Sequence, residues 1–281
     1  MPELPEVETV VRDLRPLVVG RTILGVEVGE RKLRRPWDAA WAARLAGVRI
    51  EAIRRRGKWI LIDLSVGARL VVHLGMTGQF TAVPALAPRP DHLHVTFTLS
   101  GLVELRFRDV RRFGSVELVA DEGAAMAGLD AKLGPEPFDI PPAAFHAAVT
   151  GTARTLKALL LDQSLVAGVG NIYADEALHR AGLHPETRGR QLTKGQVGRL
   201  REAIAAVITH AIEKRGSTIR DYVGGSGLKG GYQREFRAYG RTGEPCATCQ
   251  VPIERVRVAG RSSHFCQRCQ RVARTTGEPP A

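Results

Sequence analysis

The first six residues combine a proline and two carboxylates in a way that could do chemistry. Pro2, Glu3 and Glu6 stand directly behind the initiator methionine. This methionine is commonly trimmed when the next residue is small, and Pro2 would then carry a free secondary amine. A terminal amine titrates at about 7.7–8.0, so near neutral pH a part of it is unprotonated and nucleophilic. The structural alternative is that Pro5 begins a helix whose positive dipole end suits the two glutamates.

The four cysteines form two C-x2-C pairs separated by sixteen residues. This spacing is typical of zinc ribbons, in which four thiolates surround one tetrahedral ion. Two disulfides are the alternative, but a chain that shows no signal segment is expected in a reducing compartment. A closed thiolate shell leaves no coordination position open. We therefore expect one structural zinc ion on Cys246, Cys249, Cys266 and Cys269.

The stretch ERVRVAGRSSHF between the two pairs predicts a β-hairpin, because RVRV alternates and AG can form the turn. Arg261 follows that turn and is expected to be exposed near the hairpin tip. It is either a solvated arginine or a contact to phosphate.

Composition favours a polyanionic partner. The 281 residues carry a net charge of +12 with a pI of about 10.2, and arginines outnumber lysines by 34 to 7. Arginine suits bidentate phosphate contacts, although a GC-rich genome also enriches it. Aromatic residues make up only 5% of the chain, which argues against a base-stacking platform for single strands. With no apolar run near 18 residues, we expect a cytoplasmic protein without a membrane partner.

The elements that position these residues change character along the chain. Residues 5–18 show helical spacing of apolar side chains. From residue 22 to about 118, short β-type segments follow one another with glycine turns between several of them. Many short strands behind one leading helix predict an N-terminal β-sandwich or flattened barrel, here assigned to residues 1–130.

The second half of the chain is predicted to be helical, so the fold class is α+β. Four segments have helical patterns, the longest with Thr193 as N-cap and Gly216 as its stop. A stretch with five glycines in residues 224–231 predicts a mobile loop. The expected divisions are a linker at 131–142, a helical domain at 143–240 with the mobile loop 223–232, a zinc finger at 241–271 and a disordered tail at 272–281.

Several motifs in order make the chain resemble the formamidopyrimidine-DNA glycosylase family. They are PELPEVET, RRGKW, HLGMTG, RRFG, LDQSLVAGVGNIYADEAL and the finger YGRTGEPC…GRSSHFCQRCQ. The resemblance runs from Pro2 to Cys269. It implies a β-sandwich, a helix-two-turn-helix and a zinc finger. It also implies a bifunctional enzyme of base excision repair that removes oxidised purines, such as 8-oxoguanine and formamidopyrimidines, from damaged double-stranded DNA and cleaves the abasic strand by β,δ-elimination.

The resemblance also assigns roles to the opening residues. Pro2 would form the imine with the sugar, because a secondary amine gives a permanently charged iminium that drives elimination. Glu3 would transfer protons, and Glu6 would hold the amine or the neighbouring backbone. Lys58, which could equally be a surface lysine, would contact the phosphate beside the lesion and take part in catalysis. Arg261 would do the same from the finger.

Further residues are implied to bind DNA. Asn171 follows GVG as a predicted helix N-cap and would hold the same phosphate as Arg261. Base flipping requires a plug for the gap in the duplex, and Met76, Arg111 and Phe113 are the candidates. The glycine-rich loop would close over the flipped base. Weaker matches, which could be surface or core residues, are His92, Lys157 and Tyr239.

Two other functions remain open from the sequence. One is the sister activity on oxidised pyrimidines, as in endonuclease VIII, although Leu4 favours the formamidopyrimidine branch. The other is a non-catalytic zinc-ribbon protein that binds DNA, against which the full set of proposed catalytic residues speaks. We expect a monomer, and the nucleophile requires that Met1 be removed.

Overall fold

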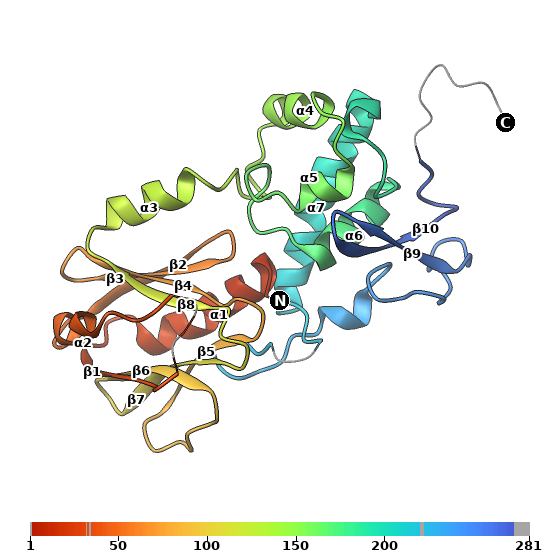
Figure 1. Ribbon diagram of the computed structural model, residues 1–281. Helices are drawn as coiled ribbons and strands as arrows, with labels where there is room; N and C mark the ends of the chain where they lie inside the picture. The colour runs from red at the N-terminus through yellow and green to blue at the C-terminus, as the bar shows by residue number, and fades with distance from the viewer. Residues whose placement is uncertain (1, 32, 34, 220–221, 273–281) are drawn as a thin grey trace, which may run out of the picture. The chain divides into compact units, whose positions relative to one another are not determined.

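The computed structural model describes residues 2–31, 33, 35–219 and 222–272 (Figure 1). The chain divides into two compact units, which are Met1–Ala131 with Ala211–Gln233, and Lys132–His210 with Arg234–Ala281. Met1 and all of the predicted tail except Val272 lie outside the described residues. We found no helix in the described ranges that is long and apolar enough to cross a membrane.

The first unit contains two antiparallel four-stranded sheets, so the expected β-sandwich is confirmed. One sheet has the order β1-β6-β7-β5 and the other β2-β3-β4-β8. The strands are β1 (Ile23–Val28), β2 (Ile50–Arg56), β3 (Trp59–Leu64), β4 (Arg69–His73), β5 (Gly78–Pro84), β6 (Leu93–Leu99), β7 (Val103–Asp109) and β8 (Ser115–Val119).

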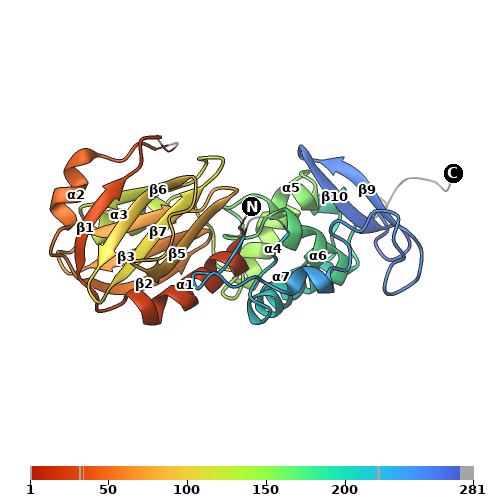
Figure 2. The same cartoon turned by 90° about the horizontal axis from the view of Figure 1, so that it is seen from below.

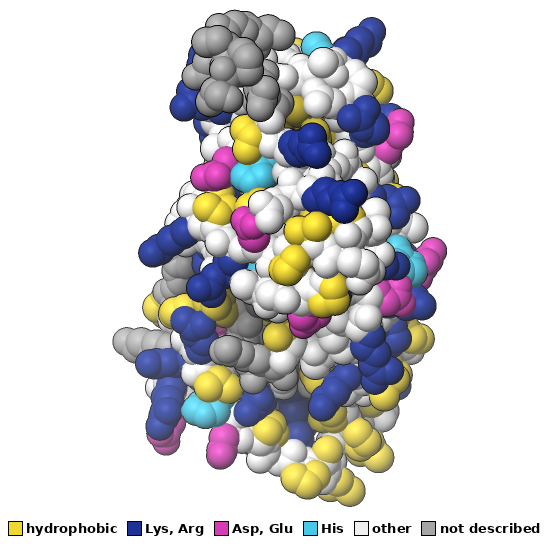
Figure 3. All heavy atoms as spheres, turned by 90° about the vertical axis from the view of Figure 1, so that its right-hand side faces the viewer, with side chains coloured by type: hydrophobic (Ala, Val, Ile, Leu, Met, Phe, Trp, Pro, Cys, Tyr) yellow, Lys and Arg dark blue, Asp and Glu magenta, His cyan; other side chains and the backbone are white. Residues whose placement is uncertain are grey.

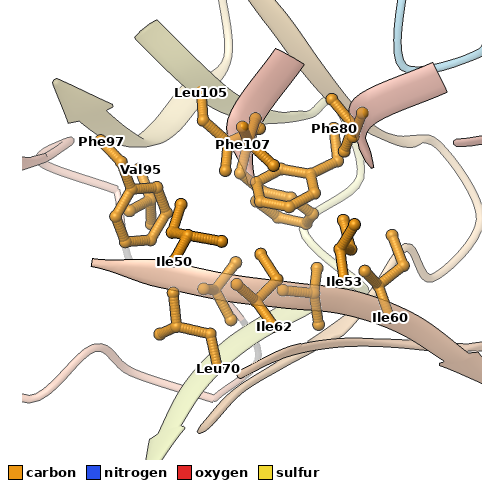
Figure 4. Packing of buried hydrophobic residues seen from close by; sticks show 14 of the residues in the cluster. Ile50, Ile53, Ile60, Ile62, Leu70, Phe80, Val95, Phe97, Leu105 and Phe107 are labelled. Carbon is orange, nitrogen blue, oxygen red and sulfur yellow. The ribbon is translucent and has the colours of Figure 1, made fainter. Parts of the chain in front are cut away.

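The core of the β-sandwich forms where the inner faces of the two sheets meet. Figure 4 shows Phe80, Phe97 and Phe107 from one sheet opposite Ile53 and Ile62 from the other, and all five side chains are at most 1% exposed. Alternating apolar residues reach this core because successive side chains of a strand point to opposite faces. The period-two pattern in the sequence therefore fixes which face of each sheet is buried.

Three helices belong to the same unit. Helix α1 (Leu4–Val18) adds its apolar face to the sandwich core, as its helical spacing predicts. The short helices α2 (Ala39–Leu45) and α3 (Glu122–Asp130) correct the expectation of one leading helix only. Each begins at an aspartate N-cap, Asp38 or Asp121, whose side chain accepts a backbone N–H of the first turn.

The second unit is built on helices around its own apolar core. They are α4 (Pro142–Thr150), α5 (Leu156–Leu160), α6 (Asn171–Ala181) and most of α7 (Lys194–Glu213), with the 3-10 turns η1 (Gly189–Gln191) and η2 (Tyr232–Glu235). Helix α7 begins at the predicted cap, where Thr193 Oγ1 accepts the Gln196 N–H. It ends before Gly216, whose φ of 71° is left-handed.

The predicted hairpin of the finger is present in the second unit. Strands β9 (Ile253–Val258) and β10 (Arg261–Cys266) pair in antiparallel register. The turn consists of Ala259 and Gly260, both with positive φ, as a two-residue type I′ turn requires. Strand β10 lies beside α6 (Figure 2).

Candidate functional site

The N-terminal carboxylates are held at the start of α1. Glu3 and Glu6 are both buried, with 2% and 1% of their surface exposed. Glu6 Oε2 accepts the Glu3 N–H at 2.8 Å, and Glu6 Oε1 accepts the Ser217 N–H at 2.7 Å. Because both oxygens of Glu6 accept backbone donors, this side chain orients the N-terminal residues. The helix-start interpretation of the sequence is also correct, since Pro5 lies in the first turn of α1.

The segment after α7 completes this arrangement. A Cβ on Gly216 would lie 2.7 Å from Glu6 Oε1, so the close approach requires glycine. Tyr222 Oη donates to the backbone oxygen of Glu6 at 3.2 Å. Burial and then the Glu6 carboxylate raise the pKa of Tyr222, which keeps the phenol protonated as a donor.

Lys58 occupies a tight turn in the same unit. Arg56 of β2 pairs with Trp59 of β3, so Gly57 and Lys58 form a two-residue hairpin turn. Gly57 has a φ of 55°, which such a turn favours in glycine. Only 9% of the surface of Lys58 is exposed, and this burial does not fit the surface-lysine alternative.

The residues proposed to enter the duplex lie on two loops of the first unit. Met76 stands between β4 and β5, and it is half-buried rather than part of the core. Arg111 and Phe113 lie on the loop between β7 and β8, and both are exposed. The guanidinium carbon of Arg111 is 4.6 Å from the centre of the Phe113 ring. His92 precedes β6 with a left-handed φ of 62°.

Asn171 is the first residue of α6 rather than its N-cap. The cap is Gly170, whose carbonyl oxygen accepts the Ala174 N–H at 3.0 Å. Asn171 Oδ1 is buried and accepts no hydrogen bond from the described residues. A phosphate has no hydrogen to offer this oxygen, so a phosphate contact by Asn171 would come from its Nδ2 amide group.

Lys157 does not lie on the surface. Its side chain is completely buried, so the structure does not support direct contact with DNA. Lys157 Nζ instead donates to Asp175 Oδ1 at 2.6 Å and to the backbone oxygen of Asn171 at 2.9 Å. The buried ammonium is neutralised by Asp175, and it fixes the first residue of α6.

The same aspartate reaches the finger. Asp175 Oδ2 accepts both the backbone N–H and Nδ1 of His264 at 2.9 Å, and His264 lies on β10. Arg261 is the exposed first residue of β10. One carboxylate thus holds both the start of α6, which carries Asn171, and the strand that begins with Arg261.

A second carboxylate of α6 holds the chain that enters the finger. Glu176 is 2% exposed and accepts three consecutive backbone N–H groups, those of Arg237, Ala238 and Tyr239, at 2.8–2.9 Å. The Tyr239 ring lies 5.2 Å from the His264 ring in an edge-to-face arrangement. Tyr239 is half-buried and therefore partly open to solvent.

The four cysteines are brought together as predicted, and none forms a disulfide. Their sulfur atoms all lie within 4.8 Å of one another. The Cys246–Cys269 separation is 3.9 Å, and a zinc–sulfur tetrahedron with bonds of about 2.3 Å has edges of about 3.8 Å. Burial and the neighbouring sulfur atoms raise the pKa of Cys266 and raise that of Cys269 to about 12. A dication that binds the sulfur atoms displaces the thiol protons and neutralises the thiolates, so the site fits one structural zinc ion.

Sequence reasoning missed the carboxylates that support the site. Asp175 and Glu176 follow GNIYA within the helix pattern, where an adjacent acidic pair is normally solvent-facing. Asp109 immediately precedes VRRFG and is 0% exposed. The available signal was their place, since Asp175 and Glu176 lie within one of the quoted motifs and Asp109 lies beside another, whereas nothing in the local period shows that they are buried.

Three family profiles match the chain in the order of its parts. Residues 1–116 match the formamidopyrimidine-DNA glycosylase N-terminal domain, and residues 133–223 match the H2TH domain of the same family. Residues 243–272 match the zinc finger found in FPG and IleRS. Fold and site therefore define a DNA glycosylase of the helix-two-turn-helix class with a zinc finger.

Relatives identify the family. The formamidopyrimidine-DNA glycosylase of Geobacillus kaustophilus is 46% identical, over 96% of this chain and 100% of the relative. That of Chloroflexus aggregans is also 46% identical, with 96% and 98% covered. The chain belongs to the formamidopyrimidine-DNA glycosylase family.

Solved structures agree in fold. The complex between Lactococcus lactis Fpg and an abasic site containing DNA has a TM-score of 0.88 at 37% identity, and the match covers 96% of this chain and 99% of the other. MutM in complex with carbocyclic 8-oxo-G containing DNA has a TM-score of 0.88 at 38% identity, with 96% and 100% covered.

Proposed function

We propose that this enzyme removes oxidised purines from duplex DNA and then cleaves the abasic strand, with the amine of Pro2 as nucleophile. The amine attacks the anomeric carbon of the lesion's sugar, and the bond to the base breaks. Glu3 supplies the proton to the leaving base or the sugar oxygen. The nitrogen loses its proton, and the ring C–O bond at the anomeric carbon then breaks to give the iminium. The iminium acidifies the neighbouring sugar carbon, so loss of protons from the sugar in β- and then δ-elimination expels the two phosphates.

The observation that carries this proposal is the fixed pair of carboxylates at the N-terminus. Glu6 uses both oxygens on the backbone donors of Glu3 and Ser217, and Glu3 is the carboxylate adjacent to Pro2, so we assign proton transfer to Glu3. Pro2 would carry a secondary amine, a group that no interior residue offers. Because Glu6 holds the neighbouring Glu3 in place, this arrangement suits imine chemistry. Removal of Met1 is part of the proposal.

DNA binding is assigned to several basic and polar groups. Lys58 and Arg261 contact phosphates near the lesion and assist the eliminations, and Asn171 and Arg261 hold the same phosphate. Basic side chains are spread over the face displayed in Figure 3. The gap left by the flipped base is filled by Met76, Arg111 and Phe113. His92 and Tyr239 add contacts to the DNA backbone. The loop 223–232 covers the flipped base.

The zinc ion builds the finger and takes no part in the chemistry. When bound to the four thiolates it supplies the cross-link that a short hairpin needs for stability. Arg261 is then presented from a folded β10. The protein acts in the cytoplasm as a monomer in this proposal, and the bacterial origin of the relatives is consistent with the cytoplasm.

The test is excision from a panel of lesion duplexes under single-turnover conditions. One duplex carries 8-oxoguanine opposite cytosine, one carries an oxidised pyrimidine, and one is undamaged. We expect base release and a strand break on the first, and much slower reaction on the other two. Faster reaction on the oxidised pyrimidine would assign the sister activity, and binding without any cleavage would leave only a DNA-binding protein.

A further inference from the structure

Asp109 is a buried carboxylate that the chemistry described above does not use. It ends β7, opposite Gly78 at the start of β5, and it is 0% exposed. Its Oδ1 accepts the Thr77 hydroxyl at 2.5 Å and the Arg111 N–H at 3.2 Å. Its Oδ2 accepts the Gly114 N–H at 2.8 Å. One side chain thus binds both loops that carry the proposed gap-filling residues.

Thr77, on the Met76 loop, also bonds directly to the loop that carries Arg111 and Phe113. Besides donating to Asp109, Thr77 Oγ1 accepts the backbone N–H of Arg111 at 3.0 Å. Thr77 directly follows Met76, and Arg111 stands two residues before Phe113. The three groups therefore form a closed set of hydrogen bonds at the roots of the two loops.

The backbones of the loops also touch each other. A Cβ on Gly75 would lie 2.5 Å from the Gly114 nitrogen, and one on Gly114 would lie 2.6 Å from the His73 oxygen. Only glycine allows this approach. The loops can therefore move as one body, held by Asp109 and Thr77.

The backbone of Asp109 extends the connection to a third residue. Its N–H donates to the carbonyl oxygen of His92 at 3.0 Å, and its own carbonyl oxygen lies 2.8 Å from His94 Nε2. His92 is one of the proposed DNA contacts. Its position is thus set by the same residue that sets the two loops.

We infer that Asp109 and Thr77 are positioning residues that lock the Met76 loop and the Arg111–Phe113 loop into one rigid wedge for opening the duplex. This inference rests on the proposed function, in which the wedge replaces a flipped base. A wedge of fixed shape loses little freedom when it enters the base stack, whereas two independent loops would have to be ordered at that moment. Loss of these hydrogen bonds should slow excision, which requires a paired base to be flipped. It should have little effect on cleavage of a strand from which the base is already absent.

The experiment compares two substitutions of Thr77. Thr77→Val removes both hydrogen bonds and keeps the branched shape, whereas Thr77→Ser keeps the hydroxyl. Each protein is given a duplex with 8-oxoguanine opposite cytosine and a duplex with a preformed abasic site. The readout is the rate constant of single-turnover excision divided by the rate constant of abasic-strand cleavage. The fraction of active protein affects both rates equally, so it does not change this ratio.

We expect Thr77→Val to lower this ratio about three- to tenfold, in line with the modest net contribution of the two hydrogen bonds that Thr77 Oγ1 makes. Thr77→Ser should stay within about twofold of the unaltered protein. Asp109→Asn should lower the ratio at least as much as Thr77→Val, because its amide must face at least one of the three donors. An unchanged ratio in Thr77→Val or Asp109→Asn overturns the inference, since a purely structural role would slow both reactions equally. Unaltered protein that cleaves neither duplex would instead refute the proposed function, and this inference with it.

Discussion

At the level of single residues, the proposed mechanism gives different roles to Glu3 and Glu6. Glu6 is fully engaged by the N–H groups of Glu3 and Ser217, so its charge serves geometry. Glu3 is buried directly after Pro2, and its side chain accepts the Glu6 N–H in a capping box. Two carboxylates three residues apart on one helix start can therefore have different roles, because their surroundings differ.

The role of Glu3 leads to a direct prediction. Glu3→Gln should bind a lesion duplex nearly normally but excise about 10²–10⁴-fold more slowly, because it keeps the shape and the backbone donor while removing proton transfer. Single-turnover excision and equilibrium binding measure the two effects. Glu27→Gln, an exposed carboxylate on β1, is the control and should change neither. A Glu3→Gln protein within threefold of the unaltered rate would remove Glu3 from the mechanism.

Gly216 offers a second prediction at this scale. Gly216→Ala places a methyl group 2.7 Å from Glu6 Oε1 on a residue with a φ of 71°. Gly20→Ala is the matched control, since Gly20 has a φ of 83° and no neighbour within 4 Å of its Cβ. Both share the backbone strain, and Gly216→Ala should lose about 1–3 kcal/mol more. Thermal unfolding and excision rate are the measurements, and equal losses in the two variants would show that Glu6 is not tightly placed.

Some residues could be identified from sequence and others could not, for physical reasons. Pro2 and the four cysteines stand out because their chemistry depends on local position and spacing. Lys157 could not be placed, because its partner Asp175 lies 18 residues away and His264 lies 89 residues beyond that. Whether a charged side chain is buried depends on such partners far away in the sequence, and the local sequence pattern does not indicate them.

At the scale of elements, α6 supports both the helical core and the finger. Its second turn carries Asp175 and Glu176, which bind β10 and the chain leading into the finger. The helix itself was predictable from its period, but its cap was assigned one residue late. Gly170 takes the extended conformation of an N-cap without any side-chain signal. Helix α2 was missed because seven residues are too few to show a helical period.

The buried ion pair between Lys157 of α5 and Asp175 of α6 predicts that removing one of its charges strongly destabilises the protein. Asp175→Asn leaves the Lys157 ammonium buried without its counter-charge and should cost about 3–5 kcal/mol of unfolding free energy. Glu244→Gln breaks the exposed ion pair with Arg241 in the same unit and should cost less than about 1 kcal/mol. Denaturant unfolding compares the two. A small effect of Asp175→Asn would mean that Lys157 reaches solvent.

The zinc finger gives a prediction about metal. Stripping zinc, or Cys249→Ser, should impair binding to lesion duplex while the β-sandwich stays folded, because the two have separate apolar cores. Zinc content, circular dichroism and duplex affinity are measured on the same samples. Zinc-free protein that binds and cleaves normally would show that the finger is dispensable.

At the level of the whole molecule, the net charge of +12 predicts that affinity for duplex DNA falls steeply as the salt concentration rises. Arg261→Ala should weaken duplex binding without releasing zinc, since Arg261 is not a ligand. If this arginine neutralises one phosphate, the slope of log affinity against log salt should become shallower by about one unit. An unchanged slope over a salt series would mean that Arg261 contacts no phosphate.

The central claim, that the chain attacks DNA with its own N-terminal amine, has one most direct test. The protein is incubated with a lesion duplex and borohydride, and the trapped adduct is digested and mapped by mass spectrometry. We expect DNA on the N-terminal peptide, at Pro2. When one residue is retained ahead of Pro2, we expect no adduct, with duplex binding intact. An adduct on Lys58, or trapping that survives the blocked terminus, would contradict it.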